Sequence, residues 1–179
     1  FYVMQGELYT EEAFGTKGEL TESYDKLMDE QPEYYVFNGA ANALMGDNAL
    51  KAEVGETVRI YFGVGGPNKT SSFHVIGEIL DKVYSYGSLT SPVATDVQTV
   101  TVAPGGATVA ELRFEVPGRY LLVDHALSRA AREGFQTRTS AMARPLRISS
   151  APEAKANWAP TLYWEFPWRQ QKPLRRKPA

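Results

Sequence analysis

The chain has 179 residues, with 19 basic and 21 acidic side chains, 43% hydrophobic residues and no cysteine. These values are typical of one soluble domain, or of one domain with an appendage. The apolar runs are far shorter than the roughly 20 residues of a membrane-spanning helix. The N-terminal sequence FYVMQGELYT lacks the charged and apolar regions of a signal peptide. We therefore expect no membrane span and no export signal in the chain.

The absence of cysteine excludes several kinds of site. It rules out disulfides, thiolate nucleophiles, iron–sulfur clusters, zinc ribbons and blue-copper centres, because each needs a sulfur that methionine cannot replace. Imidazole chemistry is limited to the two histidines of the chain, His74 and His125.

The predicted elements are one short helix and a series of strands. Residues 1–10 alternate between apolar and polar side chains, which predicts the end of a strand, and the glycines that follow indicate a linker. Residues 21–31 predict the helix, because apolar residues at helical spacing lie between the Thr21 cap and Pro32. Strand patterns separated by Gly/Pro turns follow at residues 34–38, 50–54, 57–63, 72–76, 79–86, 97–103, 107–116 and 119–124.

This order of elements predicts an all-β fold. Short strands joined by tight turns favour a Greek-key β-barrel or sandwich, whereas an α/β sheet would need helices between its strands. We place the barrel over roughly residues 34–124, with the short helix near the N-terminus.

The stretch after residue 128 is a different kind of polypeptide. Residues 1–128 carry 8 basic and 18 acidic side chains, a net charge of −10, whereas residues 129–179 carry 11 basic and 3 acidic, a net charge of +8. All three tryptophans and six of the eleven prolines lie in the second stretch. Such a segment could bind nucleic acid or an anionic surface. We expect instead a disordered tail over residues 135–179, because its apolar residues have no helical or strand periodicity.

Residue spacing alone leaves the chemistry open. The glycine-rich sequence GVGGPNKTSS lacks the frame of a phosphate-binding loop and indicates a turn. A triad of Ser71 or Ser72 with His74 and Asp124 is arithmetically possible, but no serine lies in a G-x-S-x-G elbow. Each histidine could be a hydrogen-bonded core residue, a metal ligand or a proton-transfer group. A catalytic metal at His125 would need ligands from other segments or chains, because it takes about three protein ligands.

Two long strings carry a family resemblance. They are YYVFNGAANALMGDNALKAEVGETVRIYFGVGGPNKTSSFHVIGEILDKVYSYG and VQTVTVAPGGATVAELRFEVPGRYLLVDHAL. Both closely resemble the second cupredoxin domain of copper-containing nitrite reductases. The resemblance covers about residues 1–130. It implies that residues 1–33 are the end of the first cupredoxin domain and a linker, and that residues 34–134 are the second domain. Residues 135–179 form a basic Pro/Trp-rich tail, with the family's final strand missing or replaced.

The resemblance implies roles for three residues. The histidine of SSFHVIGE, His74, corresponds to the family's proton donor, and Ile76 to the residue that crowds the substrate pocket. The histidine of LVDHA, His125, corresponds to a ligand of the type 2 copper. That copper lies between subunits of a homotrimer, so a neighbouring subunit would complete the site.

The resemblance also implies an activity, which is reduction of nitrite to nitric oxide in the periplasm during denitrification or nitrate assimilation. The type 1 copper site belongs to the first domain and is absent here, so the chain alone should be catalytically incomplete. An electron donor such as a small cupredoxin or cytochrome c is implied, and no nucleic-acid partner.

The resemblance stops at about Gly134. The enrichment in Arg, Pro, Ala and Trp after this residue is what an out-of-frame reading of a GC-rich gene would produce. The alternative hypothesis is a metal-free cupredoxin-like module with a structural or interaction role.

Overall fold

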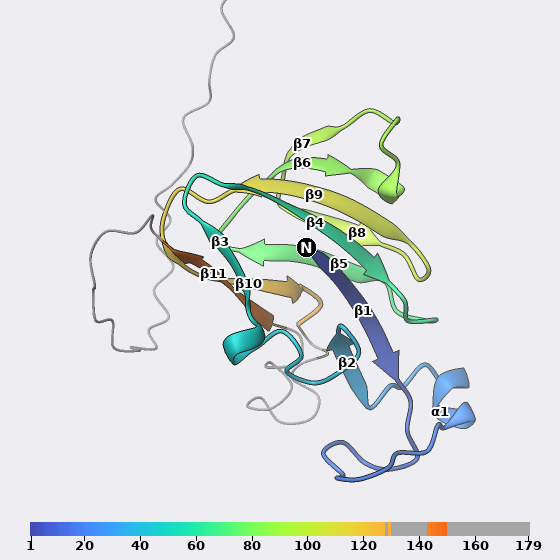
Figure 1. Cartoon of the computed structure of the whole chain (residues 1–179). Coiled ribbons are helices and arrows are strands. Elements are labelled where there is room, and N and C mark those ends of the chain that lie inside the picture. The colour runs from blue at the N-terminus through green and yellow to red at the C-terminus, as the bar shows by residue number, and fades with distance from the viewer. Residues whose placement is uncertain (128, 130–142, 150–179) are drawn as a thin grey trace, which may run out of the picture.

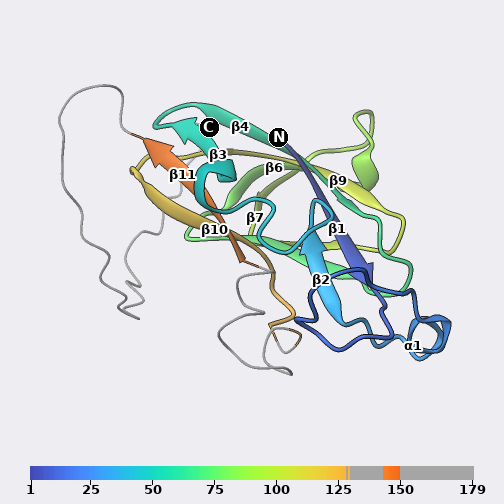
Figure 2. The same ribbon diagram turned by 60° about the horizontal axis from the view of Figure 1, so that its bottom comes forward.

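The computed structural model describes residues 1–127, 129 and 143–149, and it shows two β-sheets packed against each other (Figures 1 and 2). The six-stranded sheet has the order β2-β1-β4-β9-β6-β7, and the five-stranded sheet has the order β3-β11-β10-β5-β8. The strands are β1 (Tyr2–Leu8), β2 (Tyr34–Phe37), β3 (Leu50–Glu53), β4 (Thr57–Val64), β5 (Ser71–Ile76), β6 (Leu80–Tyr84), β7 (Ala94–Val97), β8 (Thr99–Val102), β9 (Ala107–Arg113), β10 (Gly118–Asp124) and β11 (Ala143–Ser149). The helical elements are α1 (Tyr24–Met28), η1 (Gly46–Asn48) and η2 (Ser85–Gly87).

This arrangement confirms the predicted all-β sandwich with a short helix near the N-terminus. No helix among the described residues is long and apolar enough to cross a membrane.

The core lies between the two sheets and is formed by alternate residues of the strands. In β4, Val58, Ile60 and Phe62 are buried, while Arg59 between them points away from the core. Phe62 stacks on Phe73 of β5 with ring centroids 4.2 Å apart, which joins the two sheets directly. Each fully buried side chain of this size contributes about 1.5–3 kcal/mol by leaving water. The period-2 pattern of the sequence is therefore the pattern of burial.

β1 is part of the same fold as the later strands. It runs parallel to β4, with Tyr2 opposite Tyr61, and antiparallel to β2, with Gln5 opposite Phe37. β1 thus shares a sheet with strands of the domain that the sequence places from residue 34 onward. The sequence of β1 alternates but does not show which strand it pairs with.

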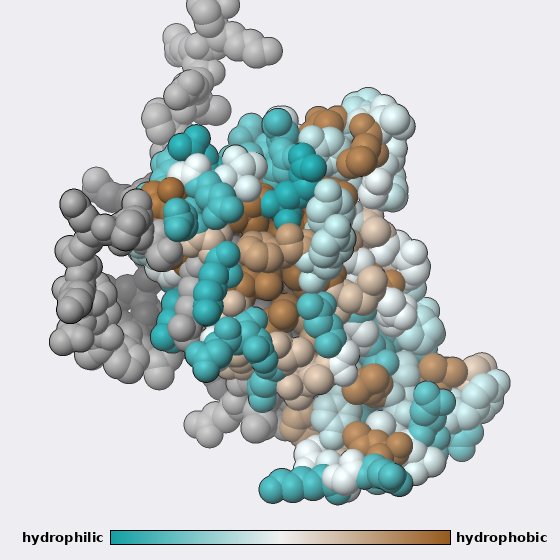
Figure 3. Space-filling model, viewed as in Figure 1, coloured by the Kyte–Doolittle hydropathy of each residue, from teal (hydrophilic) through white to brown (hydrophobic). Residues whose placement is uncertain are grey.

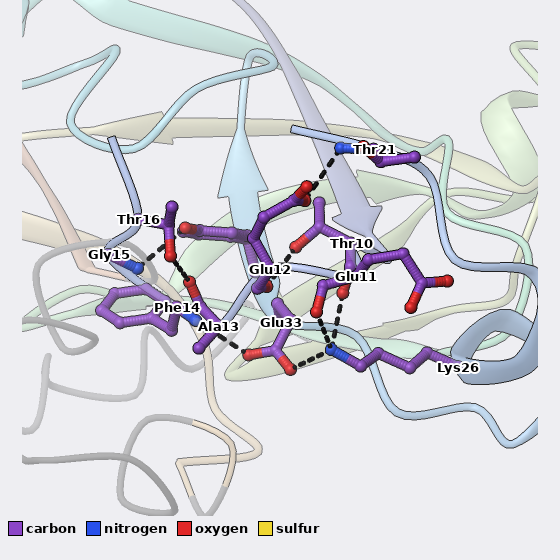
Figure 4. A network of polar contacts seen from close by, with 11 residues as sticks. Thr10, Glu11, Glu12, Ala13, Phe14, Gly15, Thr16, Thr21, Lys26 and Glu33 are labelled. Atoms are coloured by element: carbon purple, nitrogen blue, oxygen red, sulfur yellow. Dashed lines mark hydrogen bonds and ion pairs between the residues drawn. The ribbon is translucent and has the colours of Figure 1, made fainter. Parts of the chain in front are cut away.

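The chain between β1 and β2 leaves the sandwich and carries α1 beyond the ends of these two strands (Figures 1 and 2). Lys26 of α1 ties this loop together, because its Nζ donates to the Thr10 carbonyl (2.6 Å) and to Glu33 Oε1 (2.8 Å) (Figure 4). The carboxylate of Glu12 accepts a hydrogen bond from the backbone N–H of Thr21 at 2.8 Å. These bonds satisfy backbone groups that no strand pairs.

One predicted strand, at 97–103, is in fact divided between the two sheets. β7 pairs with β6 in the six-stranded sheet, and β8 pairs with β5 in the five-stranded sheet. The chain crosses from one sheet to the other at Gln98, just after Asp96, which has a φ of 58°. The crossing leaves the Gln98 carbonyl outside both ladders, where a side chain can reach it.

β11 lies in the stretch that was expected to be a disordered tail. It pairs antiparallel with β10, with Tyr120 opposite Leu146, and parallel with β3, with Ala52 opposite Ile148. Ile148 is buried in the core. Residues 143–149 therefore form a strand in a stretch where disorder was expected, and the other residues of the tail lie outside the described residues. β10 and β3 each offer a row of hydrogen-bonding groups, and this context outweighs weak local periodicity.

Hydrophobic residues also reach the surface. On the face seen in Figure 3, apolar residues gather in the middle of the molecule, with hydrophilic residues on both sides. A groove of about 530 Å³ lies on the six-stranded sheet, and its lining includes Tyr2, Met4, Tyr61 and Leu89. Neither histidine lines this groove, so it is not the site that the sequence predicts.

Candidate metal and proton-transfer site

β5 carries two of the three predicted site residues on one face. Phe73 and Val75 are fully buried in the core, whereas His74 is half-buried and Ile76 is 38% exposed. The alternation of a strand therefore points His74 and Ile76 away from the core on the same side. In the ladder with β10, Val123 lies opposite His74 and Leu121 lies opposite Ile76.

His125 follows β10 directly and lies beside His74. Its backbone N–H donates to the Ser72 carbonyl at 2.8 Å, which extends the β5–β10 ladder by one step. The ring centroids of His74 and His125 are 5.4 Å apart, with an angle of 65° between the ring planes. Two histidines separated by 51 positions in the sequence thus become neighbours on one face of the five-stranded sheet.

The imidazole of His74 is held by the crossing between the sheets. Its Nδ1 lies 2.6 Å from the Gln98 carbonyl oxygen, which can only accept, so Nδ1 carries a hydrogen. In the neutral ring the other nitrogen, Nε2, is then the acceptor, and in the charged ring Nε2–H is a second donor. Nε2 is therefore the atom at which His74 gains or loses its proton.

Burial lowers the pKa of His74 below its ordinary value of 6.5, and the nearby His125 lowers this pKa further. The hydrogen bond to the Gln98 carbonyl acts in the opposite direction, because it favours the charged ring. Desolvation is the largest of these effects. The balance keeps the His74 imidazole neutral near pH 7, and acidification charges it.

The imidazole of His125 is exposed, and no hydrogen bond within the described part of the chain occupies either of its ring nitrogens. Imidazole nitrogens suit copper well. No group of three or more His, Cys, Asp or Glu among residues 1–127, 129 and 143–149 could hold a metal ion. The described residues therefore do not form a metal site by themselves. An exposed histidine with available nitrogens fits a copper site whose other ligands come from another segment or chain.

The structure also shows a residue whose role the sequence did not reveal. Asp124 was considered only as the acid of a Ser–His–Asp triad, but its carboxylate is fully buried, and none of its hydrogen bonds among the described residues goes to a histidine ring. The hydroxyl of Ser71 donates to Gln5, and no serine hydroxyl of the described residues bonds to His74. The triad is therefore not formed. A charged residue in the apolar run LLVD was the available signal, because a buried carboxylate requires partners.

The fold and this pair of histidines define a cupredoxin-like domain with an exposed imidazole suited to copper. No protein-family profile matches the sequence. Curated relatives do match it. A copper-containing nitrite reductase of Neisseria meningitidis serogroup A is 51% identical over 134 residues, which are 75% of this chain and 34% of that protein. A copper-containing nitrite reductase of Alcaligenes faecalis is 35% identical over 131 residues, with 73% of this chain and 34% of that protein covered.

Solved structures agree with these relatives. The copper-containing nitrite reductase of Thermus scotoductus SA-01 has a TM-score of 0.66 at 28% identity, and the match covers 83% of this chain and 30% of that chain. The copper nitrite reductase of Nitrosomonas europaea also has a TM-score of 0.66, at 27% identity, covering 83% of this chain and 48% of that chain. The chain therefore has a cupredoxin-like fold, and it is similar to copper-containing nitrite reductases over about three quarters of its length. It spans about a third of the length of the curated relatives it matches.

Proposed function

We propose that this chain is the second cupredoxin domain of a copper-dependent enzyme that reduces nitrite to nitric oxide. The observation that carries the proposal is the pairing of the histidines of SSFHVIGE and LVDHA, whose rings lie 5.4 Å apart on one exposed face. Similarity to copper-containing nitrite reductases supports the same reading.

His125 acts in this proposal as the chain's single ligand to a type 2 copper. Its ring is exposed, which leaves a nitrogen available to a metal that lies outside this domain's surface. Two further imidazoles come from the first domain of a neighbouring subunit, as in a homotrimer. When bound, copper would hold nitrite at an open position and pass it one electron.

His74 acts as the proton donor to nitrite. Reduction of nitrite by one electron consumes two protons and gives nitric oxide and water, so a nearby acid accelerates the step. The Gln98 carbonyl holds Nδ1–H and so directs the exchangeable proton to Nε2. Because burial lowers the pKa of His74, the charged ring gives up this proton readily, and it regains the proton as the pH falls.

Ile76 limits the room beside the proton donor. It lies two positions along β5 from His74 and on the same face, with its side chain partly exposed. An apolar side chain there excludes water and leaves space for a small anion only.

The rest of the enzyme supplies what these residues lack. The type 1 copper and its cysteine belong to the first domain, so the chain alone is catalytically incomplete. An electron donor such as a small cupredoxin or cytochrome c, and a periplasmic location, complete the proposal.

The test joins this chain by peptide ligation to the first domain of a nitrite reductase relative and measures copper content and nitric oxide production. We expect His125→Ala to empty the type 2 site and abolish nitrite reduction. His74→Ala should keep its copper and slow turnover by about 10²- to 10⁴-fold, the usual range for general acid catalysis. Thr101→Ala, an exposed change on the neighbouring strand β8, is the matched control and should alter neither quantity.

Two outcomes would contradict the proposal. If His74→Ala loses copper while His125→Ala keeps it, the two roles are reversed. If neither variant changes activity, a metal-free structural or interaction module becomes the better explanation.

A further inference from the structure

We infer that Asp124 is a positioning residue that fixes the backbone on both sides of His125 and thereby aims its imidazole at the metal position. The inference rests on the proposed function, because it takes His125 to be a copper ligand. It assigns a task to a buried charge that the proposed reaction does not otherwise use.

The carboxylate of Asp124, the residue before His125, accepts hydrogen bonds from two backbone N–H groups, one on the paired strand β5 and one on the residue after His125. Its Oδ1 accepts a hydrogen bond from the N–H of Ser72 at 3.0 Å, on the strand that pairs with this end of β10. The same oxygen accepts from the N–H of Ala126, also at 3.0 Å. Because Ala126 follows His125, this second bond turns the chain immediately after the histidine. The position of His125 is thus fixed from the preceding and the following residue.

The second oxygen of Asp124 has two side-chain partners. Gln5 Nε2 donates to Oδ2 at 3.0 Å, and Arg129 Nη1 forms an ion pair with the same oxygen. Arg129 also lies over the ring of Tyr35, 5.4 Å from its centroid. The carboxylate is fully buried and the arginine side chain is 20% exposed, so solvent screens this pair little.

Gln5 extends the network to the opposite sheet. It is fully buried in β1 of the six-stranded sheet, and its Oε1 accepts a hydrogen bond from the Ser71 hydroxyl at 2.7 Å. Both ends of its amide are therefore used, one by β5 and one by Asp124. The end of β10 is tied in this way to both sheets of the sandwich.

This network matters for His125 because little else holds that ring. The imidazole is exposed, and no hydrogen bond within the described residues reaches it. Its direction must therefore follow from the backbone at residues 124–126, which the carboxylate controls. A buried ion pair is a poor device for stability alone, since apolar residues of similar volume often serve as well or better. Second-sphere groups that orient a ligand typically change metal affinity by about 10- to 100-fold.

The test compares Asp124→Asn with Glu111→Gln. Asparagine keeps the size of the side chain and one acceptor, but its NH₂ group would face the donors of Gln5 and Arg129. Glu111→Gln removes the charge from another carboxylate–arginine pair, in β9, and is the matched control. We expect Asp124→Asn to abolish the nuclear Overhauser effect between the His74 and His125 rings in the full chain. Copper affinity in the ligated protein should fall by about 10- to 100-fold.

Arg129 supplies a second pair of variants if Asp124→Asn does not fold. Arg129→Met should weaken copper binding and the ring-to-ring effect, and Arg129→Lys, which keeps the charge, should restore part of both. A merely structural role would lower stability without moving the ring-to-ring effect at temperatures where the chain is folded.

Two results separate the possible failures. If Asp124→Asn and Arg129→Met keep the ring-to-ring effect and a copper affinity within about twofold of Glu111→Gln, the positioning role is wrong. If His125→Ala keeps its copper, the proposed ligand is wrong, and the ring-to-ring effect in the full chain still decides whether Asp124 positions His125.

Discussion

Asp124 and Glu111 are both buried carboxylates bound to arginine, one in each sheet, but their surroundings differ. Glu111 lies in β9 between two neighbouring strands and meets Arg59 at 2.5 Å and Lys82 at 3.7 Å. The side chains of both cations are more than 50% exposed. Asp124 is fully buried, and its partners are two backbone N–H groups, the amide of Gln5 and an arginine that is 20% exposed.

The difference shows what each carboxylate does. Glu111 forms cross-strand ion pairs with two cations that are exposed to solvent. Water therefore screens the attraction, and the pairs contribute little to stability. Asp124 lies inside the end of the sandwich, where every oxygen must be satisfied and the loss of a partner is costly. A buried network of this kind fixes the local backbone, and His125 is the residue whose backbone it fixes.

The largest expected effect comes from removing the two carboxylates in turn. Asp124→Ala leaves Arg129 and two backbone N–H groups without their acceptor, so it should lower the free energy of unfolding by about 3–5 kcal/mol. Glu111→Ala should cost about 1 kcal/mol or less, because its cations can turn to water. Urea denaturation of the full chain measures both. Equal losses would remove the distinction between the two carboxylates.

A smaller effect on stability should follow from a change in β11, a strand of the five-stranded sheet. Ile148→Ala removes a side chain that is 5% exposed in the core, and we expect a loss of about 2–3 kcal/mol. Lys51→Ala, at an exposed position of the adjacent strand β3, should change stability by about 0.5 kcal/mol or less. If Ile148→Ala matched Lys51→Ala, β11 would not contribute to the core.

The smallest effect concerns the charge of His74 in the metal-free chain. Its pKa should lie below 6.5 in an NMR titration. His125→Ala should raise this pKa only part of the way, because desolvation is the larger cause and remains. Since the folded-state pKa is lowered, His74 favours folding above about pH 6.5, and this contribution is lost as the pH falls toward the lowered value. His74→Gln should therefore reduce the loss of stability on acidification. A His74 pKa at or above 6.5 would contradict the burial of the ring.

The sequence predicts most of this fold because its signals are local. Tight turns and period-2 patterns locate the strands, and residues 24–28 fall within the predicted helix. The parallel partner of β1 and the pairing of β11 are not visible in the sequence, because a strand's own residues do not specify its neighbours. The break at Gln98 was missed for a related reason. The run VQTVTV continues the strand pattern while the chain passes from one sheet to the other.

The candidate site was predictable in part. The family resemblance picks out His74, Ile76 and His125, and the ladder between β5 and β10 brings all three to one face. Asp124 and its partners could not be assembled from the sequence, because Gln5, Ser71 and Arg129 come from distant segments and share no spacing. Spacing rules find groups on one element, whereas this network depends on how the two sheets pack.

The most direct measurement counts the copper-bound nitrogens that this chain supplies. The chain would be labelled with ¹⁵N-histidine, ligated to the unlabelled first domain of a nitrite reductase relative and loaded with copper. Pulsed electron paramagnetic resonance of the type 2 copper then separates ¹⁵N from ¹⁴N couplings. We predict a single directly coordinated ¹⁵N nitrogen, which disappears in His125→Ala and persists in His74→Ala. Two such couplings, or none, would contradict the assignment of His125 as the chain's one ligand and of His74 as the proton donor beside it.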